Sequence, residues 1–157
     1  MDDRPADTSA APLAEIRSRA VKLLTTREHS RLELERKLRH RGYPLEAVAA
    51  VLDALEREAL LSEDRLLETY VAERLDKGFG PLRIRAELQG KGLSDSRIEP
   101  EIDISDEQLL DLMATVHDRR FGTDSRNDQQ TLAKRARFLE YRGFPSYLIS
   151  RLLNAED

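Results

Sequence analysis

Apolar residues recur along this chain with the spacing of helices, and no stretch alternates with the period of two that is typical of strands. The clearest stripe is Val48, Val51, Leu52 and Leu55, which stand at positions i, i+3, i+4 and i+7. Weaker stripes of the same kind lie on both sides of it. Together they predict an all-α protein of nine helices, which begin near Leu13, Ser30, Pro44, Ser62, Leu82, Ser94, Ser105, Gln130 and Ser146.

Three glycines mark an internal repeat. Gly42, Gly92 and Gly143 are separated by 50 and 51 residues. A leucine lies four residues before each glycine and a β-branched residue lies six residues after it; these are Leu38, Leu88 and Leu139, and Val48, Ile98 and Ile149. Because the same residue types recur at the same spacing, the pattern predicts three tandem units of three helices. We expect a disordered tail over residues 1–12 and repeats over residues 13–61, 62–104 and 105–157.

Residues typical of helix ends support this division. Ser30 with Glu33, and Ser105 with Gln108, have the spacing of a capping box. A glycine directly after a helix favours a left-handed cap, and a proline favours the first turn of the next helix. We therefore expect Pro100 to end the third helix of the second unit by Glu99. Structural roles are assigned to Gly42, Gly78, Gly80, Pro81, Gly92 and Gly143.

The composition favours a thin array over a compact domain. Of the 157 residues 36% are charged and 39% apolar, and there is no Trp, so each residue buries little. An elongated stack in which each unit contacts its neighbours fits such a chain. The absence of Cys excludes disulfides and cysteine-based zinc sites. No signal peptide or membrane-spanning run is visible, so we expect a cytoplasmic protein without membrane contact.

Charge is segregated between the helices, although the net charge is only −4. The second helix of each unit carries +3, +2 and +3, which leaves −12 for the rest of the chain. These basic helices predict a discontinuous surface for phosphates or for acidic patches of a partner. The alternative is a solvated face balanced by acidic neighbours. The candidate binding residues are Arg31, Arg36, Lys37, Arg39, Arg41, Arg83, Arg85, Lys91, Lys134 and Arg137.

Catalytic and cofactor signatures are missing from the sequence. His29, His40 and His117 lack the spacing of metal ligands, and we expect them at the surface or at its boundary. The Gly-x-Gly at Gly78 follows no predicted strand, so it is a poor nucleotide loop. Aromatic residues amount to 5% and are expected to fill small cores rather than stack on bases. We therefore expect no enzyme, no cofactor and no metal.

Four further segments stand out: Leu61-Ser-Glu-Asp-Arg65, Tyr70-Val71, Lys77-Gly-Phe-Gly-Pro-Leu-Arg-Ile84 and, near the end, Arg137-Phe-Leu with Arg142-Gly-Phe144. These segments resemble the RecX family, regulators of the RecA recombinase. The resemblance covers about residues 13–153 and is most specific in the middle unit. It implies a curved, all-helical array of three tandem three-helix repeats, with no enzymatic activity. It also implies a regulator that binds RecA, or its filament on single-stranded DNA, and restrains its activities.

Other functions remain open at this stage. A helical-repeat module that binds DNA independently of RecA is the main alternative. A RecA regulator could also make a weak direct contact with single-stranded DNA. Three-helix units near 50 residues are also similar to Myb-type DNA-binding repeats, but those need core tryptophans, and this chain has none. An enzyme is the third alternative, which the missing motifs disfavour. For the regulator we expect a monomer.

Overall fold

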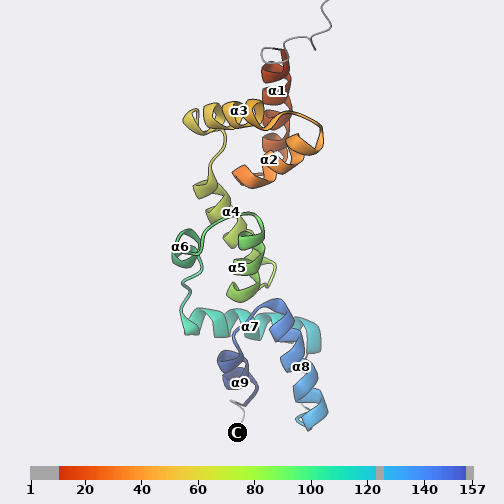
Figure 1. Ribbon diagram of the computed structural model, residues 1–157. Helices are drawn as coiled ribbons and strands as arrows, with labels where there is room; N and C mark the ends of the chain where they lie inside the picture. Colours follow the sequence, from red (N-terminus) through yellow and green to blue (C-terminus); the bar gives the residue numbers. More distant parts are fainter. Residues whose placement is uncertain (1–10, 123–125, 155–157) are drawn as a thin grey trace, which may run out of the picture. The chain divides into compact units, whose positions relative to one another are not determined.

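The computed structural model describes residues 11–122 and 126–154 (Figure 1). Within these ranges all regular structure is helical, with nine α-helices and one short 3-10 helix. The expected tail lies mostly outside the described residues, and α1 begins at Ala11. By its contacts the chain divides into two compact units, residues 1–66 and 67–157. The repeat boundaries inferred from the sequence stay a prediction.

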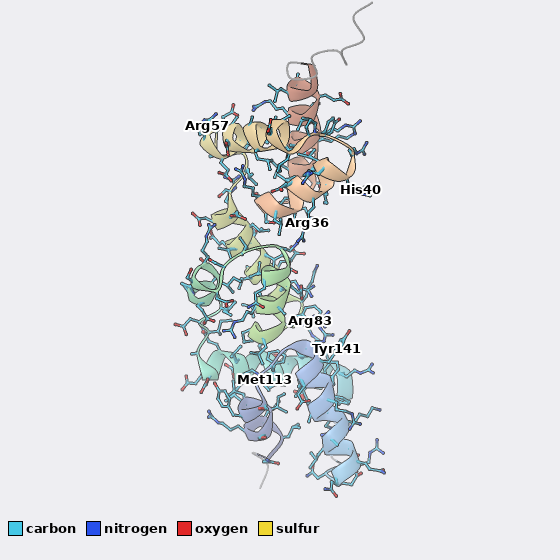
Figure 2. All side chains as sticks on the ribbon, viewed as in Figure 1. Arg36, His40, Arg57, Arg83, Met113 and Tyr141 are labelled. Atoms are coloured by element: carbon cyan, nitrogen blue, oxygen red, sulfur yellow. The ribbon has the colours of Figure 1, made fainter. Side chains whose placement is uncertain are left out.

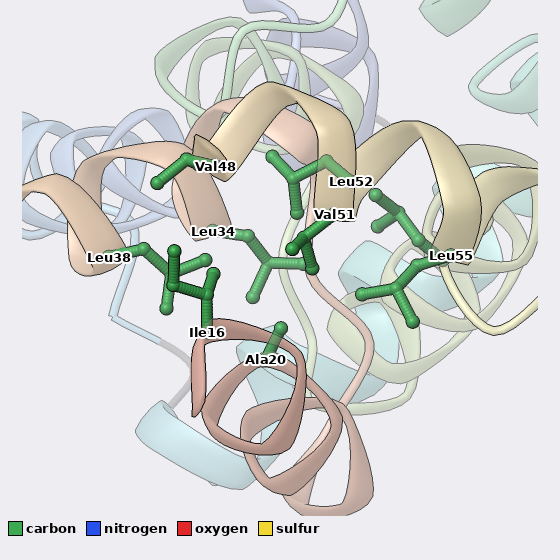
Figure 3. Packing of buried hydrophobic residues seen from close by; sticks show 9 residues of the cluster. Ile16, Ala20, Leu34, Leu38, Val48, Val51, Leu52 and Leu55 are labelled. Carbon is green, nitrogen blue, oxygen red and sulfur yellow. The ribbon is translucent and has the colours of Figure 1, made fainter. Parts of the chain in front are cut away.

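The first three helices build one closed hydrophobic core. They are α1 (Ala11–Thr26), α2 (Arg31–His40) and α3 (Leu45–Arg57), and each packs against the other two. Figure 3 shows the buried side chains of the three helices meeting between them. The stripe of α3 is buried as its spacing predicts. This core consists of Ile16, Ala20, Leu34, Leu38, Val48, Val51, Leu52, Leu55 and Leu61.

The remaining helices continue the pattern. α4 (Glu63–Asp76), α5 (Pro81–Gly90) and α6 (Asp95–Ile98) precede a 3-10 helix at Glu99–Glu101. α6 therefore ends before Pro100, as the sequence predicts. α7 (Asp106–Phe121), α8 (Gln129–Arg142) and α9 (Ser146–Asn154) pack around a second core that includes Met113, Leu139 and Phe144. α8 is capped by Asp128, so it begins about one turn before Thr131, the position equivalent to Ser30.

The repeat glycines adopt the predicted left-handed turn. Gly42, Gly92 and Gly143 have φ values of 93°, 90° and 100°. The residue after each glycine donates its N–H to the carbonyl of the leucine four residues before the glycine, at 3.2–3.4 Å, and each glycine N–H donates to a carbonyl three residues back. This is the Schellman arrangement of a helix end. The leucines and the β-branched residues that follow are at most 3% exposed, so each repeat buries the same pair.

The start of α5 contacts the turn between α8 and α9. The N–H of Gly80 donates to the carbonyl of Arg142 at 2.7 Å, and the N–H of Leu82 to that of Gly143 at 3.0 Å. These amides lie at the start of a helix, where they have no partner within it. A Cβ on Gly80 would lie 2.5 Å from the carbonyl oxygen of Gly143, and a Cβ on Gly143 would lie 2.4 Å from the Cβ of Arg83. This approach therefore requires glycine on both sides.

The glycine turns should differ in their tolerance to substitution. Gly143→Ala should lower the free energy of unfolding by about 3 kcal/mol, because a strained φ adds to overlap with the backbone of Arg83. Gly42→Ala should cost about 1 kcal/mol, because only the φ is strained and the new Cβ would meet nothing within 4 Å. Unfolding in denaturant measures both losses.

Gly90→Ala is the matched control. Gly90 lies within α5, has no positive φ and has open space around it. Alanine there should raise the free energy of unfolding by about 0.5 kcal/mol, because it lowers the entropy of the unfolded chain. Equal losses at Gly42 and Gly143 would show that the close approach of α5 to α8 contributes nothing.

Candidate partner-binding site

The second helix of the first repeat presents free positive charge. Its N-terminus is fixed by the capping box of Ser30 and Glu33, which turns Leu34 and Leu38 into the core. Arg36, Arg39 and Arg41 are exposed, and within the described residues their side chains make no hydrogen bond or ion pair. Figure 2 shows Arg36 and His40 on α2. The fold leaves these guanidinium groups available to a partner.

The other two candidate cations of α2 hold contacts within the first repeat. Arg31 forms ion pairs with Asp53 and Glu56 of α3, at 2.8 and 3.1 Å. The Nζ atom of Lys37 lies 2.8 Å from Nε2 of His29. These side chains therefore tie α2 to its surroundings, and replacing them would change folding as well as any binding.

The three candidate cations of the middle repeat are all engaged. Arg83 bonds Glu87 at 3.2 Å and the carbonyl of Tyr141 at 3.3 Å. Arg85 pairs with Glu99. The Nζ atom of Lys91 lies 5.0 Å from the ring centre of Tyr70, within the range of a cation–π contact. The middle repeat thus uses these basic residues in contacts within the fold.

Glu87 is the centre of this network. Its carboxylate accepts hydrogen bonds from the hydroxyl of Tyr70, from Arg74 at 2.7 Å and from Arg83. Partial burial raises the pKa of Glu87, but the bonds from Tyr70 and Arg74, together with the positive charge of Arg74, outweigh burial and hold the pKa below its ordinary value. The carboxylate therefore stays ionised and links α4 to α5.

Phe79 joins the same network through its ring. The guanidinium carbons of Arg74, Arg83 and Arg142 lie 3.8, 4.5 and 4.6 Å from the centre of the ring. Arg142 also donates to the carbonyl of Lys77 at 3.1 Å. Such contacts stabilise an arginine that is partly desolvated. As the sequence suggests, the Gly-Phe-Gly segment is a packing element and not a nucleotide loop.

The basic helix of the third repeat is divided between surface and core. Lys134 and Arg137 of α8 are exposed, and within the described residues neither has a partner. Arg135 is only 5% exposed, which its charge did not predict. Tyr141 and Tyr147 are 74% and 57% exposed, so the expectation that the aromatics fill cores is wrong for these two. Figure 2 shows Tyr141 on α8.

Sequence reasoning missed two cations on α1. Arg19 and Lys22 line one groove together with Arg36, Lys37 and Arg41 of α2. Charges were counted on the second helices alone, so these residues were not considered. Their spacing of i and i+3, beside the buried stripe of α1, was the signal that could have revealed them.

His29 is buried, contrary to the expectation that all three histidines lie at the surface or its boundary. Its exposure is 0%, and its Nδ1 lies 3.0 Å from the carbonyl oxygen of Arg27. An ammonium group can only donate, so Nε2 accepts from Lys37, and Nδ1–H donates to the carbonyl. Burial lowers the pKa of His29, and the nearby charges of Arg27 and Lys37 lower it further. The imidazole is therefore neutral and positions Lys37.

The described residues contain neither a cluster of metal ligands nor a helix that could span a membrane. No cluster of three or more His, Asp or Glu side chains suited to a metal ion occurs in residues 11–122 and 126–154. Across the same residues, none of the helices combines the length and the apolar character needed to cross a bilayer.

Comparison with protein families matches nearly the whole chain to one family. Residues 17–55 match the first three-helix domain of RecX, residues 62–99 the second, and residues 106–153 the third. Each matched segment begins and ends within one of the sequence repeats. The first match spans α1 to α3, and the third spans α7 to α9.

Individual relatives agree with this match. The chain is 44% identical over 142 residues to the regulatory protein RecX of Pseudomonas putida (strain GB-1), which covers 90% of this chain and 91% of that protein. It is 47% identical over 146 residues to the regulatory protein RecX of Pseudomonas fluorescens, with 90% and 92% covered. The crystal structure of RecX from Lactobacillus salivarius superposes with a TM-score of 0.77 at 22% identity, over 93% of this chain and 97% of that chain.

Removing the charge of Glu87 should destabilise the fold. Glu87→Gln should lower the free energy of unfolding at pH 7 by about 2 kcal/mol, because Tyr70 and Arg74 lose a charged acceptor. The folded-state pKa lies below the ordinary value of 4.5, so this stability is present above that pH and is lost as the pH falls through the folded pKa. Unfolding in denaturant measures the difference: the free energies of unfolding of the two proteins should differ at pH 7 and become similar at about pH 3.

Glu73→Gln is the control for this experiment. Glu73 is exposed and pairs with Lys77 at 2.7 Å one turn along α4, so its loss should change stability little. If Glu87→Gln also changes nothing at pH 7, the network around Glu87 does not stabilise the fold.

Acid should weaken the fold through His29. A folded-state pKa below the ordinary value of 6.5 means that the unfolded chain binds the proton more readily. The stabilisation is complete above that pH and is lost as the pH falls from there through the folded pKa. Between about pH 7 and 5 the free energy of unfolding should therefore fall, and it should fall less in His29→Gln. His40→Gln, at the exposed end of α2, should keep the full slope. The same slope in all three proteins would contradict a neutral, buried His29.

Proposed function

This chain belongs to the RecX family, and on that premise we propose that it binds the RecA recombinase, assembled as a filament on single-stranded DNA, and lowers the recombinase, ATPase and coprotease activities of RecA. Matches to all three RecX domains and identities above 40% to relatives of nearly the same length support this proposal. Regulation then operates through binding, since the chain lacks the motifs of a catalytic centre.

The free cations of α2 are the observation that carries the proposed contact. Arg36, Arg39 and Arg41 are exposed and support no part of the described fold. Complementary charges across an interface steer association and set its orientation. We extend the contact to Lys134 and Arg137 of α8, which are free in the same way. The other candidate cations also hold partners within the chain, so their substitution cannot separate binding from folding.

Direct binding to single-stranded DNA without RecA is the second candidate, and Tyr141 favours it. Its ring is 74% exposed on a basic helix. The guanidinium of Arg83 lies 4.9 Å from the ring centre. An exposed aromatic ring among cations can stack on a base. This candidate predicts tight binding of an oligonucleotide in the absence of RecA.

Charge reversal on α2 tests the first candidate. In the double variant Arg36→Glu, Arg39→Glu, the concentration that half-inhibits the DNA-dependent ATPase of RecA should rise about tenfold or more, because attraction becomes repulsion. The unfolding midpoint should stay near that of the unaltered protein, since neither side chain supports the core. Inhibition by the unaltered protein should weaken with added salt, as screening requires.

Arg57→Glu, Arg119→Glu is the matched control, because it changes the net charge equally. Both arginines are exposed outside the three basic helices, and in the described residues their side chains form no hydrogen bond or ion pair. This control should inhibit RecA as the unaltered protein does. Equal inhibition by the α2 variant would remove α2 from the contact. Tight oligonucleotide binding without RecA, lost together with inhibition, would favour the DNA-binding module instead.

A further inference from the structure

A groove of about 670 Å³ lies between α1 and α2 in the first repeat. Five cationic side chains line it: Arg19 and Lys22 from α1, and Arg36, Lys37 and Arg41 from α2. No carboxylate is among its lining residues. A concave surface lined by charges of one sign concentrates the field and attracts groups of the opposite sign.

The fold neutralises only part of this charge. Arg19 lies 3.8 Å from the carboxylate of Glu15 and donates to the hydroxyl of Tyr43 at 2.7 Å. Within the described residues, the side chains of Lys22, Arg36 and Arg41 have neither a hydrogen bond nor an ion pair. The groove therefore holds at least three cations that an anionic ligand can reach without breaking a contact of the fold.

The walls of the groove are apolar between these charges. Leu23 is half-buried at its side and Leu38 closes it from the core, while the methylene stems of the lysine and arginine side chains add to the apolar surface. Among the lining residues the one ring is the imidazole of His40, and none of the larger rings of Phe, Tyr or Trp is available for a base to stack on. Its volume lies within the usual range of ligand pockets. The combination fits carboxylates with an apolar side chain between them better than it fits a nucleic acid.

We propose that this groove binds an acidic peptide segment of a partner protein, with an apolar side chain of the segment against Leu23 and its carboxylates on Lys22, Arg36 and Arg41. The inference rests on the proposed function, in which α2 faces the partner, and it names the chemistry that α2 recognises. It also explains why α1 carries cations beside α2: two helices supply the two sides of one anionic site.

Peptide binding tests the groove directly and without RecA. The probe is a fluorescein-labelled peptide of glutamates and aspartates with one central leucine, followed by fluorescence anisotropy. The full-length variant Lys22→Glu, Arg41→Glu should bind it at least about tenfold more weakly than the unaltered protein, which corresponds to about 1.4 kcal/mol. The control Arg57→Glu, Arg119→Glu has the same net charge and should bind nearly as the unaltered protein does, because neither residue lines the groove.

Changes in the peptide test the two halves of the proposal. Replacing its acids by their amides should abolish binding, and replacing the leucine by serine should weaken it about tenfold, because the apolar contact is lost. Equal binding by the two variants, or by the amide peptide, would overturn the proposal. Binding of a thymidine oligonucleotide that is lost in the groove variant, with no binding of the peptide, would make the groove a nucleic-acid site.

The result is separable from the RecA titration. In one outcome the peptide does not bind, but the variant Arg36→Glu, Arg39→Glu still loses inhibition of RecA. That outcome would contradict the groove proposal and leave the proposed function standing. Peptide binding that succeeds while that variant inhibits RecA normally would support the groove and remove α2 from the contact with RecA.

Discussion

Each repeat depends on a turn in which a glycine with positive φ lets two helices share one core. In the first repeat, Gly42 ends α2, so Leu38 before it and Val48 after it are both buried in the same cluster. A residue with a side chain is strained at such a φ. Because the turn is hydrogen-bonded to the carbonyl of Leu38, its direction is set locally. Gly92 and Gly143 repeat this geometry, which is how so short a unit closes a core of its own.

Where the second and third repeats meet, backbone amides and arginines make the contacts. The first amides of α5 bond carbonyls at the end of α8, and Gly80 and Gly143 permit the approach. Around this point Arg83 and Arg142 pack on Phe79. Glu87 balances the charge that these contacts bring together.

The candidate cations whose side chains remain outside such contacts are free to bind a partner. On α2 they are Arg36, Arg39 and Arg41, and on α8 they are Lys134 and Arg137. Exposed charges of this kind contribute little to stability, whereas at an interface they steer and orient a partner. Lys22 and Arg19 extend the surface of α2 onto α1, where the groove adds apolar contact. Under the proposed function, stability and recognition thus rest on different members of one basic set.

The sequence by itself determined the helices, their caps and the threefold repeat, because these depend on residues within about one or two turns of each other. Ser30 with Glu33 and the φ of Gly42 are examples. Only the tertiary structure decided which cations are free. Arg39 and Arg83 look alike in sequence, but Arg83 reaches the carbonyl of Tyr141, 58 residues away. The tertiary structure also decided the burial of His29, the exposure of Tyr141 and the groove between α1 and α2. Contacts between residues far apart in the chain leave no periodic signal, so a local pattern could have pointed to the cations of α1 but not to these contacts.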